Sequence, residues 1–153
     1  MSAADPYRTI GRLQGRCLCG AVTLTVDGGY VAAVGACHCG MCQRSTGALF
    51  ASFEADADAL HVAGDVTRYP STHFSERVFC PACGSHLWLR DTDRADAPFD
   101  LMPGLFPDAA GFPLISEIYI DRRTAYLPLS GNHPQRTRAA YEAQHNHVEG
   151  DTP

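Results

Sequence analysis

Seven cysteines stand in three short groups, and their spacing indicates metal chemistry. The groups are residues 17–20 (CLCG), 37–42 (CHCGMC) and 80–84 (CPACG). Two cysteines separated by two residues on a tight turn can direct both sulfurs to one tetrahedral ion. A glycine directly after such a pair lets the backbone close around the metal, because glycine adopts positive φ without steric cost. The sequence therefore predicts zinc sites made of thiolates.

Seven ligands divide most simply into a set of four and a set of three. Four thiolates make a closed structural site, whereas three leave zinc an open position for water or substrate, which is typical of catalytic zinc. The continuous second group fits the set of three, and the outer groups then supply the set of four. The predicted structural set is Cys17, Cys19, Cys80 and Cys83, and the predicted catalytic set is Cys37, Cys39 and Cys42.

Spacing alone leaves two alternatives open. A zinc ribbon would combine Cys39 and Cys42 with Cys80 and Cys83, but ribbon pairs are typically about 15–20 residues apart. Here thirty-seven residues separate Cys42 from Cys80. Alternatively both metals are structural, with His38 or an acidic residue completing the set of three.

Composition and charge argue against several other functions. The chain has 153 residues, of which 45% are hydrophobic, and this suits an ordinary globular core. All twelve basic residues are arginines, so no lysine is present for Schiff-base chemistry. The formal net charge is −5 and the arginines are scattered, so we expect no nucleic-acid partner.

The sequence also predicts a cytoplasmic protein without a membrane partner. No stretch approaches the roughly 18–20 apolar residues that span a bilayer. The N-terminal residues include an acid and a proline where a secretory signal would have its apolar run. An odd number of cysteines does not fit a closed disulfide framework, and thiols kept reduced in the cytosol favour metal binding.

Many short strands must position the cysteine groups, and we expect one zinc-binding domain over residues 1–153 with its core over about 12–130. Apolar alternation and β-branched runs predict strands over residues 21–27, 31–37, 48–54, 60–62, 66–69, 73–80, 87–90, 99–102 and 115–120. Loops are expected over 91–98 and 103–113, a helix over 134–144 and a flexible tail over 145–153. The predicted fold class is mainly β with one short C-terminal helix.

The cysteine groups and their surroundings resemble a known family. The phrases GRCLCGAV, ACHCGMCQRSTGALFASF and RVFCPACGSHLWLR are similar to those of the glutathione-dependent formaldehyde-activating enzyme (GFA) family, whose domain is shared with centromere protein V. The resemblance implies an Mss4-like (β-tent) fold of short antiparallel strands stapled by zinc. It also implies two zinc ions, held by the same sets of four and three cysteines that spacing favours.

The same resemblance implies a carbon–sulfur lyase or synthase activity. The founding reaction joins formaldehyde and glutathione to give S-hydroxymethylglutathione, so the expected partner is a small-molecule thiol or thiol adduct such as glutathione. A homo-oligomer is compatible with the sequence. The alternative hypothesis is a non-catalytic, zinc-stabilised binding module, which kinship with centromere protein V would permit.

Residues beside the cysteines carry further expectations. Arg16, Arg44 and Arg77 each lie within three residues of a cysteine group. Zinc thiolate sites carry negative charge that nearby cations must offset, so at least one arginine is expected to approach a site or a bound anion. Adjacent residues in an extended segment point opposite ways, so the His38 ring should face away from the metal. For His86 we expect a hydrogen-bonded structural role.

Two zinc ions per chain is the first testable prediction. Elemental analysis of protein purified without chelator, before and after zinc is added, should give about two zinc ions per chain, one of them easily removed, because three ligands hold less tightly than four. One tightly held ion that never rises to two would contradict the catalytic set and favour the binding module.

Overall fold

Strands dominate the computed structural model, which describes residues 2–145. The strands are β1 (Arg8–Arg16), β2 (Thr23–Val31), β3 (Val34–Cys37), β4 (Phe50–Ala55), β5 (Leu60–Ala63), β6 (Thr67–Pro70), β7 (Ser75–Phe79), β8 (His86–Asp91), β9 (Phe99–Leu101), β10 (Leu114–Ile118) and β11 (Gln135–Arg136). The helices are α1 (Gly40–Thr46) and α2 (Arg138–Glu142), with 3₁₀ turns η1 (Asp5–Tyr7), η2 (Pro103–Leu105), η3 (Pro107–Gly111) and η4 (Ile120–Arg122). Residues 146–153 of the expected tail lie outside the described residues.

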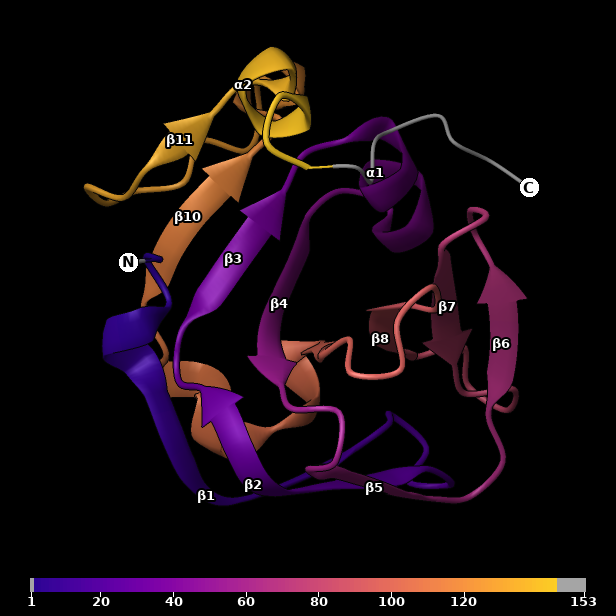
Figure 1. Ribbon diagram of the computed structural model, residues 1–153. Coiled ribbons are helices and arrows are strands. Elements are labelled where there is room, and N and C mark those ends of the chain that lie inside the picture. Colours follow the sequence, from indigo (N-terminus) through magenta and orange to yellow (C-terminus); the bar gives the residue numbers. More distant parts are fainter. Residues whose placement is uncertain (1, 146–153) are drawn as a thin grey trace.

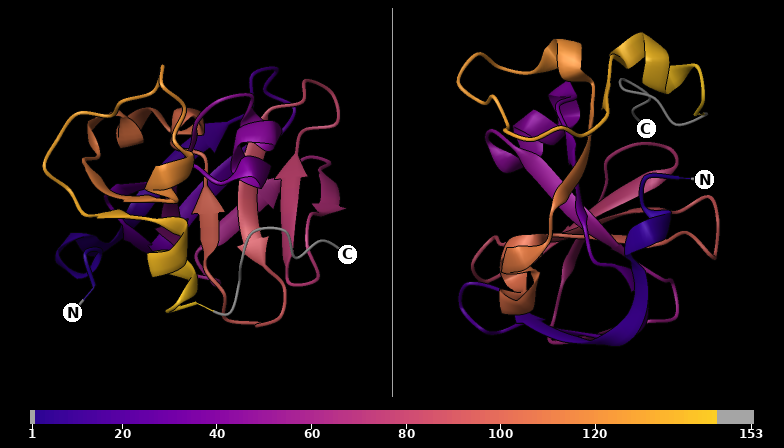
Figure 2. Two further views of the ribbon diagram at one scale, coloured as in Figure 1. Left: turned by 90° about the horizontal axis from the view of Figure 1, so that it is seen from above. Right: turned by 90° about the vertical axis from the view of Figure 1, so that its left-hand side faces the viewer.

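The strands form an open mixed sheet (Figure 1). Along its main path the order is β11-β10-β3-β4-β9-β8-β7-β6, while β2 joins at β4 and also pairs with β1 and β5. Most pairings are antiparallel, as predicted, but β10 runs parallel to both β3 and β11. Both helices lie at one end of the molecule, and β1, β2 and β5 lie at the other (Figure 2). The C-terminal segment is thereby brought to the end that carries the second cysteine group.

The larger core is centred on Phe53, which is buried in β4. Its ring meets those of Phe106 and Phe112 edge to face, with centroids 5.2 and 5.5 Å apart, and that of Tyr30 at 6.4 Å. Edge-to-face contacts between aromatic rings add to the stabilisation that burial itself provides. The segment 103–113 was predicted as a loop and contains η2 and η3, which carry Phe106 into this core.

Each of the nine predicted strands overlaps an observed one, and the differences have local causes. β10 is shorter than predicted because Tyr119 adopts the left-handed conformation, with φ of 55°. The helix predicted over 134–144 is also shorter. Its first residues pair with β10 as β11, and the Thr137 hydroxyl then caps α2 by accepting from the Ala140 N–H.

Of the longer elements, β1 and α1 were not predicted from the sequence. β1 carries an 85% exposed Ile10 and two glycines, so it lacks a clean alternation, yet it pairs in register with the whole of β2. α1 is short and begins after a cysteine instead of a usual capping residue. No helix in the described part of the chain has the length and apolar character needed to cross a membrane.

Truncating the central ring should destabilise the fold strongly. We expect Phe53→Ala to lower the free energy of unfolding by about 3–5 kcal/mol, because it leaves a cavity among three aromatic rings. Urea denaturation followed by circular dichroism measures the change. The matched surface variant Tyr126→Ala, at a residue that is 69% exposed, should change it by less than about 0.5 kcal/mol. Equal effects of the two variants would contradict this description of the core.

Candidate metal centres

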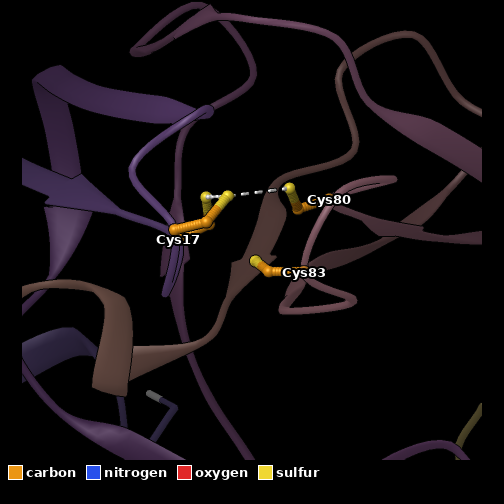
Figure 3. Close-up of side chains that lie close together, drawn as sticks. Cys17, Cys80 and Cys83 are labelled. Atoms are coloured by element: carbon orange, nitrogen blue, oxygen red, sulfur yellow. Dashed lines mark hydrogen bonds between the residues drawn. The ribbon is translucent and has the colours of Figure 1, made fainter.

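The first and third cysteine groups meet at one point (Figure 3). The four sulfur atoms of Cys17, Cys19, Cys80 and Cys83 all lie within 4.8 Å of one another. Cys19 Sγ is 3.6 Å from Cys17 Sγ and 3.8 Å from Cys80 Sγ. Thiolates at about 2.3 Å from a tetrahedral zinc are about 3.8 Å from one another, so the group could hold that ion with little rearrangement.

Two glycine turns shape this four-cysteine group. Gly20 and Gly84 have φ of 79° and 74°, the conformation predicted from their position after the cysteines. Their N–H groups donate to the carbonyl oxygens of Cys17 and Cys80, at 3.1 and 2.8 Å. These hydrogen bonds close each turn and direct the sulfurs to the same side.

Ser85 links the two turns of the four-cysteine group. Its Oγ accepts from the Leu18 N–H at 3.0 Å and lies 3.2 Å from Cys83 Sγ. The hydrogen bonds from Ser85 lower the pKa of Cys83 to about 5. A thiol that ionises this readily is a good metal ligand, because zinc binds the thiolate form.

The second cysteine group forms a separate set at the start of α1. The sulfurs of Cys37, Cys39 and Cys42 lie within 4.8 Å of one another, and all three residues are buried. Cys39 precedes the helix, and its sulfur accepts from the Cys42 N–H at 3.4 Å. The helical turn thus returns Cys42 to the other two. The structure has the four-plus-three division, and the ribbon pairing of the second and third groups is not formed.

The three-cysteine group has a charge conflict that a cation would relieve. Hydrogen bonds with Cys37 and then Cys42 lower the pKa of Cys39 to about 2. The same hydrogen bond with Cys39 raises the pKa of Cys37 well above its usual value. One thiolate is therefore stabilised by two neighbours that stay protonated. A bound zinc ion allows all three to ionise together, so this donor set fits the metal.

Arg77 on β7 reaches the three-cysteine group, as expected for at least one of three arginines. It is buried, and its guanidinium donates to Cys42 Sγ at 3.4 Å and to Ser45 Oγ at 2.9 Å. The guanidinium also lies over the Phe50 ring, 5.5 Å from its centroid. Arg77 therefore places positive charge beside the thiolates.

A cavity of about 520 Å³ opens beside the three-cysteine group. Phe50, Ser52 and Glu54 line it from one face of β4, whereas Phe53 on the opposite face packs in the core. Other side chains reach it from β7, β8, β9 and the C-terminal segment; they include Arg77, Leu89, Asp100, Arg136, Tyr141 and His145. Its size is typical of a small-molecule site.

Asp100, which sequence reasoning missed, is a titratable group in the cavity wall. Burial raises its pKa to about 7, and the charges of Glu54 and Asp91 act in the same direction. Ser52 Oγ lies 3.3 Å from its carboxylate. The carboxyl group can therefore exchange a proton near neutral pH. The sequence placed Asp100 in the predicted strand 99–102 but gave no indication that this residue lines a cavity.

Tyr141 on α2 also lines the cavity and was not singled out from the sequence. Its ring packs against the cluster that contains the three cysteines. Burial, followed by the charges of Cys37 and Asp100, raises the pKa of the phenol to about 12. The hydroxyl is consequently protonated at neutral pH.

The buried carboxylate of Glu117 contacts His38, the residue between Cys37 and Cys39. His38 Nε2 lies 2.7 Å from Glu117 Oε1, so the ring faces away from the metal group as predicted. Glu117 Oε2 lies 2.6 Å from His133 Nε2 and accepts from Gln135 Nε2 at 2.9 Å. Burial acts to raise the pKa of Glu117, but these hydrogen bonds lower it. This network connects residues 37–42, here called the metal loop, to β10 and to the C-terminal segment.

His86 has the hydrogen-bonded position predicted for it. Its Nε2 lies 3.2 Å from the carbonyl oxygen of Trp88. Burial, together with the charge of Arg77, lowers its pKa to about 4. The ring is therefore neutral at physiological pH and is not one of the grouped metal ligands in the described residues.

Comparison with known proteins agrees with the motifs and the site. The family model described as "Glutathione-dependent formaldehyde-activating enzyme" (GFA) matches residues 12–122, which include all seven cysteines. The chain belongs to this family. A Halomonas elongata protein named "Putative glutathione-dependent formaldehyde-activating enzyme" is 25% identical in a 138-residue alignment that covers 84% of this chain and 88% of the relative.

A solved structure supports the fold of this GFA family member. A crystal structure of a Rhodobacter sphaeroides protein, a structural genomics target, matches with a TM-score of 0.50 at 24% identity. The match covers 67% of this chain and 99% of that one. It extends the likeness from sequence motifs to the arrangement of the strands.

Removing the buried carboxylate should weaken the three-cysteine site. In Glu117→Ala, two histidines and a glutamine lose their acceptor, so we expect the free energy of unfolding to fall by about 2–4 kcal/mol. Loss of such an outer partner should also weaken zinc binding at the three-cysteine group by about 10- to 100-fold. Urea denaturation and zinc titration against a competing chelator measure the two effects.

A surface carboxylate provides the matched control for Glu117. Asp27 is paired with Arg12 at 3.2 Å and its side chain is 57% exposed. Asp27→Ala should cost less than about 1 kcal/mol and leave zinc affinity unchanged. If Glu117→Ala also left the affinity unchanged, the network would have no role in holding the metal loop.

Proposed function

We propose that this GFA family member is a zinc-dependent enzyme that forms and breaks a carbon–sulfur bond between a thiol and an aldehyde. The observation that carries the proposal is the three-cysteine group, one ligand short of a closed tetrahedral site, in the wall of a cavity of about 520 Å³. The family description and the name of the Halomonas relative support glutathione and formaldehyde as the substrates.

The two cysteine groups would hold two zinc ions with different roles. Cys37, Cys39 and Cys42 would hold the catalytic ion, and the four-cysteine group would hold a structural one. A zinc ion bound by three thiolates supplies a Lewis-acid centre with one position for a substrate sulfur or oxygen. Four thiolates leave no such position, so the second ion contributes to folding instead.

The protein's own residues would then provide orientation, charge balance and proton exchange. Arg77 offsets the negative charge of the thiolates through its contact with Cys42 Sγ. Phe50 and Leu89 supply apolar walls that hold the reactants together. A thiol must lose a proton when it adds to an aldehyde, and the aldehyde oxygen must gain one. Asp100, with a pKa of about 7, is suited to exchange protons at neutral pH.

We place this activity in a reducing compartment, the cytoplasm being the natural choice. All seven cysteines are free of disulfides, and zinc thiolate sites require reduced thiols. The proposed partner is a small-molecule thiol, and the negative net charge of the chain gives no support to nucleic-acid binding.

Paired cysteine variants separate the enzyme from a non-catalytic binding module. We expect Cys42→Ser to keep the fold. Its acceleration of the addition of glutathione to formaldehyde should fall at least about 100-fold, because the three-cysteine group loses one of its thiolate ligands. Cys80→Ser should instead lose cooperative thermal unfolding, since binding energy at a closed zinc site is folding energy. Circular dichroism melting and the rate of glutathione–formaldehyde addition above the spontaneous rate measure these effects.

Two results would overturn the proposal. A wild-type protein loaded with zinc that does not accelerate the addition would favour the binding module. Unfolding of Cys42→Ser would show that the three-cysteine group is structural as well. Wild-type melting and zinc content in Cys80→Ser would contradict the structural assignment of the four-cysteine group.

A further inference from the structure

Tyr141 on α2 lines the cavity beside the three cysteines. Its ring packs against the cluster formed by the cysteines, Phe50 and Tyr119, and it lines the same cavity as they do. α2 lies at the same end of the molecule as α1 (Figure 2). The residue belongs to the C-terminal segment, outside the part matched by the family model, residues 12–122.

Contacts with two other rings hold Tyr141 in place. The Tyr119 ring packs at 5.4 Å with an angle of 51°, and the His145 ring stacks at 4.0 Å with an angle of 13°. His145 Nδ1 also lies 2.9 Å from the carbonyl oxygen of Tyr141. Because the ring is restrained by packing, its hydroxyl is held ready for a ligand without a large loss of conformational freedom.

The Tyr141 hydroxyl has no hydrogen-bond partner among residues 2–145, in contrast to neighbouring donors. Tyr119 Oη donates to Glu142 Oε1 at 3.0 Å. The Arg77 guanidinium donates to Cys42 and Ser45. A phenol at neutral pH is a hydrogen-bond donor, and donors in such sites are normally satisfied by protein, water or ligand. Tyr141 is therefore a donor that a molecule in the cavity can engage.

The proposed reaction creates an acceptor that needs such a donor. When the thiolate sulfur adds to the aldehyde, its electron pair forms the carbon–sulfur bond and the carbonyl π pair moves onto oxygen. That oxygen carries negative charge until it takes up a proton equivalent to the one the thiol released. The reverse reaction passes through the same charged oxygen. A fixed donor that is already oriented toward the oxygen lowers the barrier in both directions.

We propose that Tyr141 Oη donates a hydrogen bond to the aldehyde-derived oxygen of the thiol adduct, and so acts as a catalytic residue. The inference rests on the proposed carbon–sulfur reaction. It assigns to the C-terminal helix a direct part in stabilising the reacting oxygen. Arg77, in contrast, donates a hydrogen bond to Cys42 Sγ and balances the charge of that sulfur.

The test is Tyr141→Phe, which keeps the ring and removes only the hydroxyl. The rates of glutathione–formaldehyde addition and of adduct breakdown should both fall by about 10- to 100-fold, a loss similar to or below that of one oxyanion-hole donor. The affinity for glutathione alone and the zinc content should stay within about twofold, since neither involves the reacting oxygen. Tyr126→Phe, at a 69% exposed position, is the matched control and should keep the wild-type rate.

The outcomes distinguish failure of this inference from failure of the proposed function. If wild-type protein accelerates the addition and Tyr141→Phe retains its rate, the hydroxyl has no catalytic part and only this inference is overturned. If Tyr141→Phe loses zinc or glutathione affinity in proportion to its rate, the role of Tyr141 is structural, which also overturns it. A wild-type protein without acceleration overturns the proposed function, and this inference with it.

Discussion

Closely spaced thiolates repel one another, and the arrangement of the chain depends on how that repulsion is relieved. In the three-cysteine group the low pKa of Cys39 is matched by a raised pKa of Cys37, because ionisation of one sulfur opposes ionisation of its neighbours. Arg77 supplies one positive charge, and a divalent ion would supply the remainder. The four-cysteine group uses backbone turns and the Ser85 hydroxyl instead. Metal binding at either group would thereby be linked to the local fold.

The strand β7 connects the two groups physically. Arg77 lies in the middle of this strand and contacts Cys42, and Cys80 follows directly after the strand ends. Its partner β8 supplies Leu89 to the cavity wall. A zinc ion in the four-cysteine group would anchor the turn between these two strands, and the strands carry that anchoring to the cavity. The structural ion would thus help to fix the position of Arg77 beside the second site, although it has no open position of its own.

The parts predicted well from the sequence are those set by neighbouring residues. Cysteine spacing and glycine turns depend only on residues that are close in the sequence. The same is true of the alternation of apolar and polar residues from which nine strands were predicted. β1 was missed because its order comes from pairing with β2, and not from its own pattern. Glu117 and Tyr141 were missed for a related reason. The parallel pairing of β10 with β3 brings Glu117 behind the metal loop, and the pairing of β11 with β10 then directs α2 toward the cavity. Long-range pairings of this kind leave no signal in residue spacing.

The segment that matches the family model and part of the cavity wall lie in different regions of the chain. The cysteines and Arg77 lie within residues 12–122, which the family model matches, whereas Arg136, Tyr141 and His145 reach the same cavity from beyond it. The candidate metal ligands therefore lie in a different part of the sequence from the residues that form one wall of the cavity. A different C-terminal segment on the same sheet would leave the cysteines and Arg77 in place and would change which small molecule fits in the cavity beside them. For this reason the matched segment defines the class of reaction better than it defines the substrate, and the C-terminal segment is where the selectivity of this chain is to be sought.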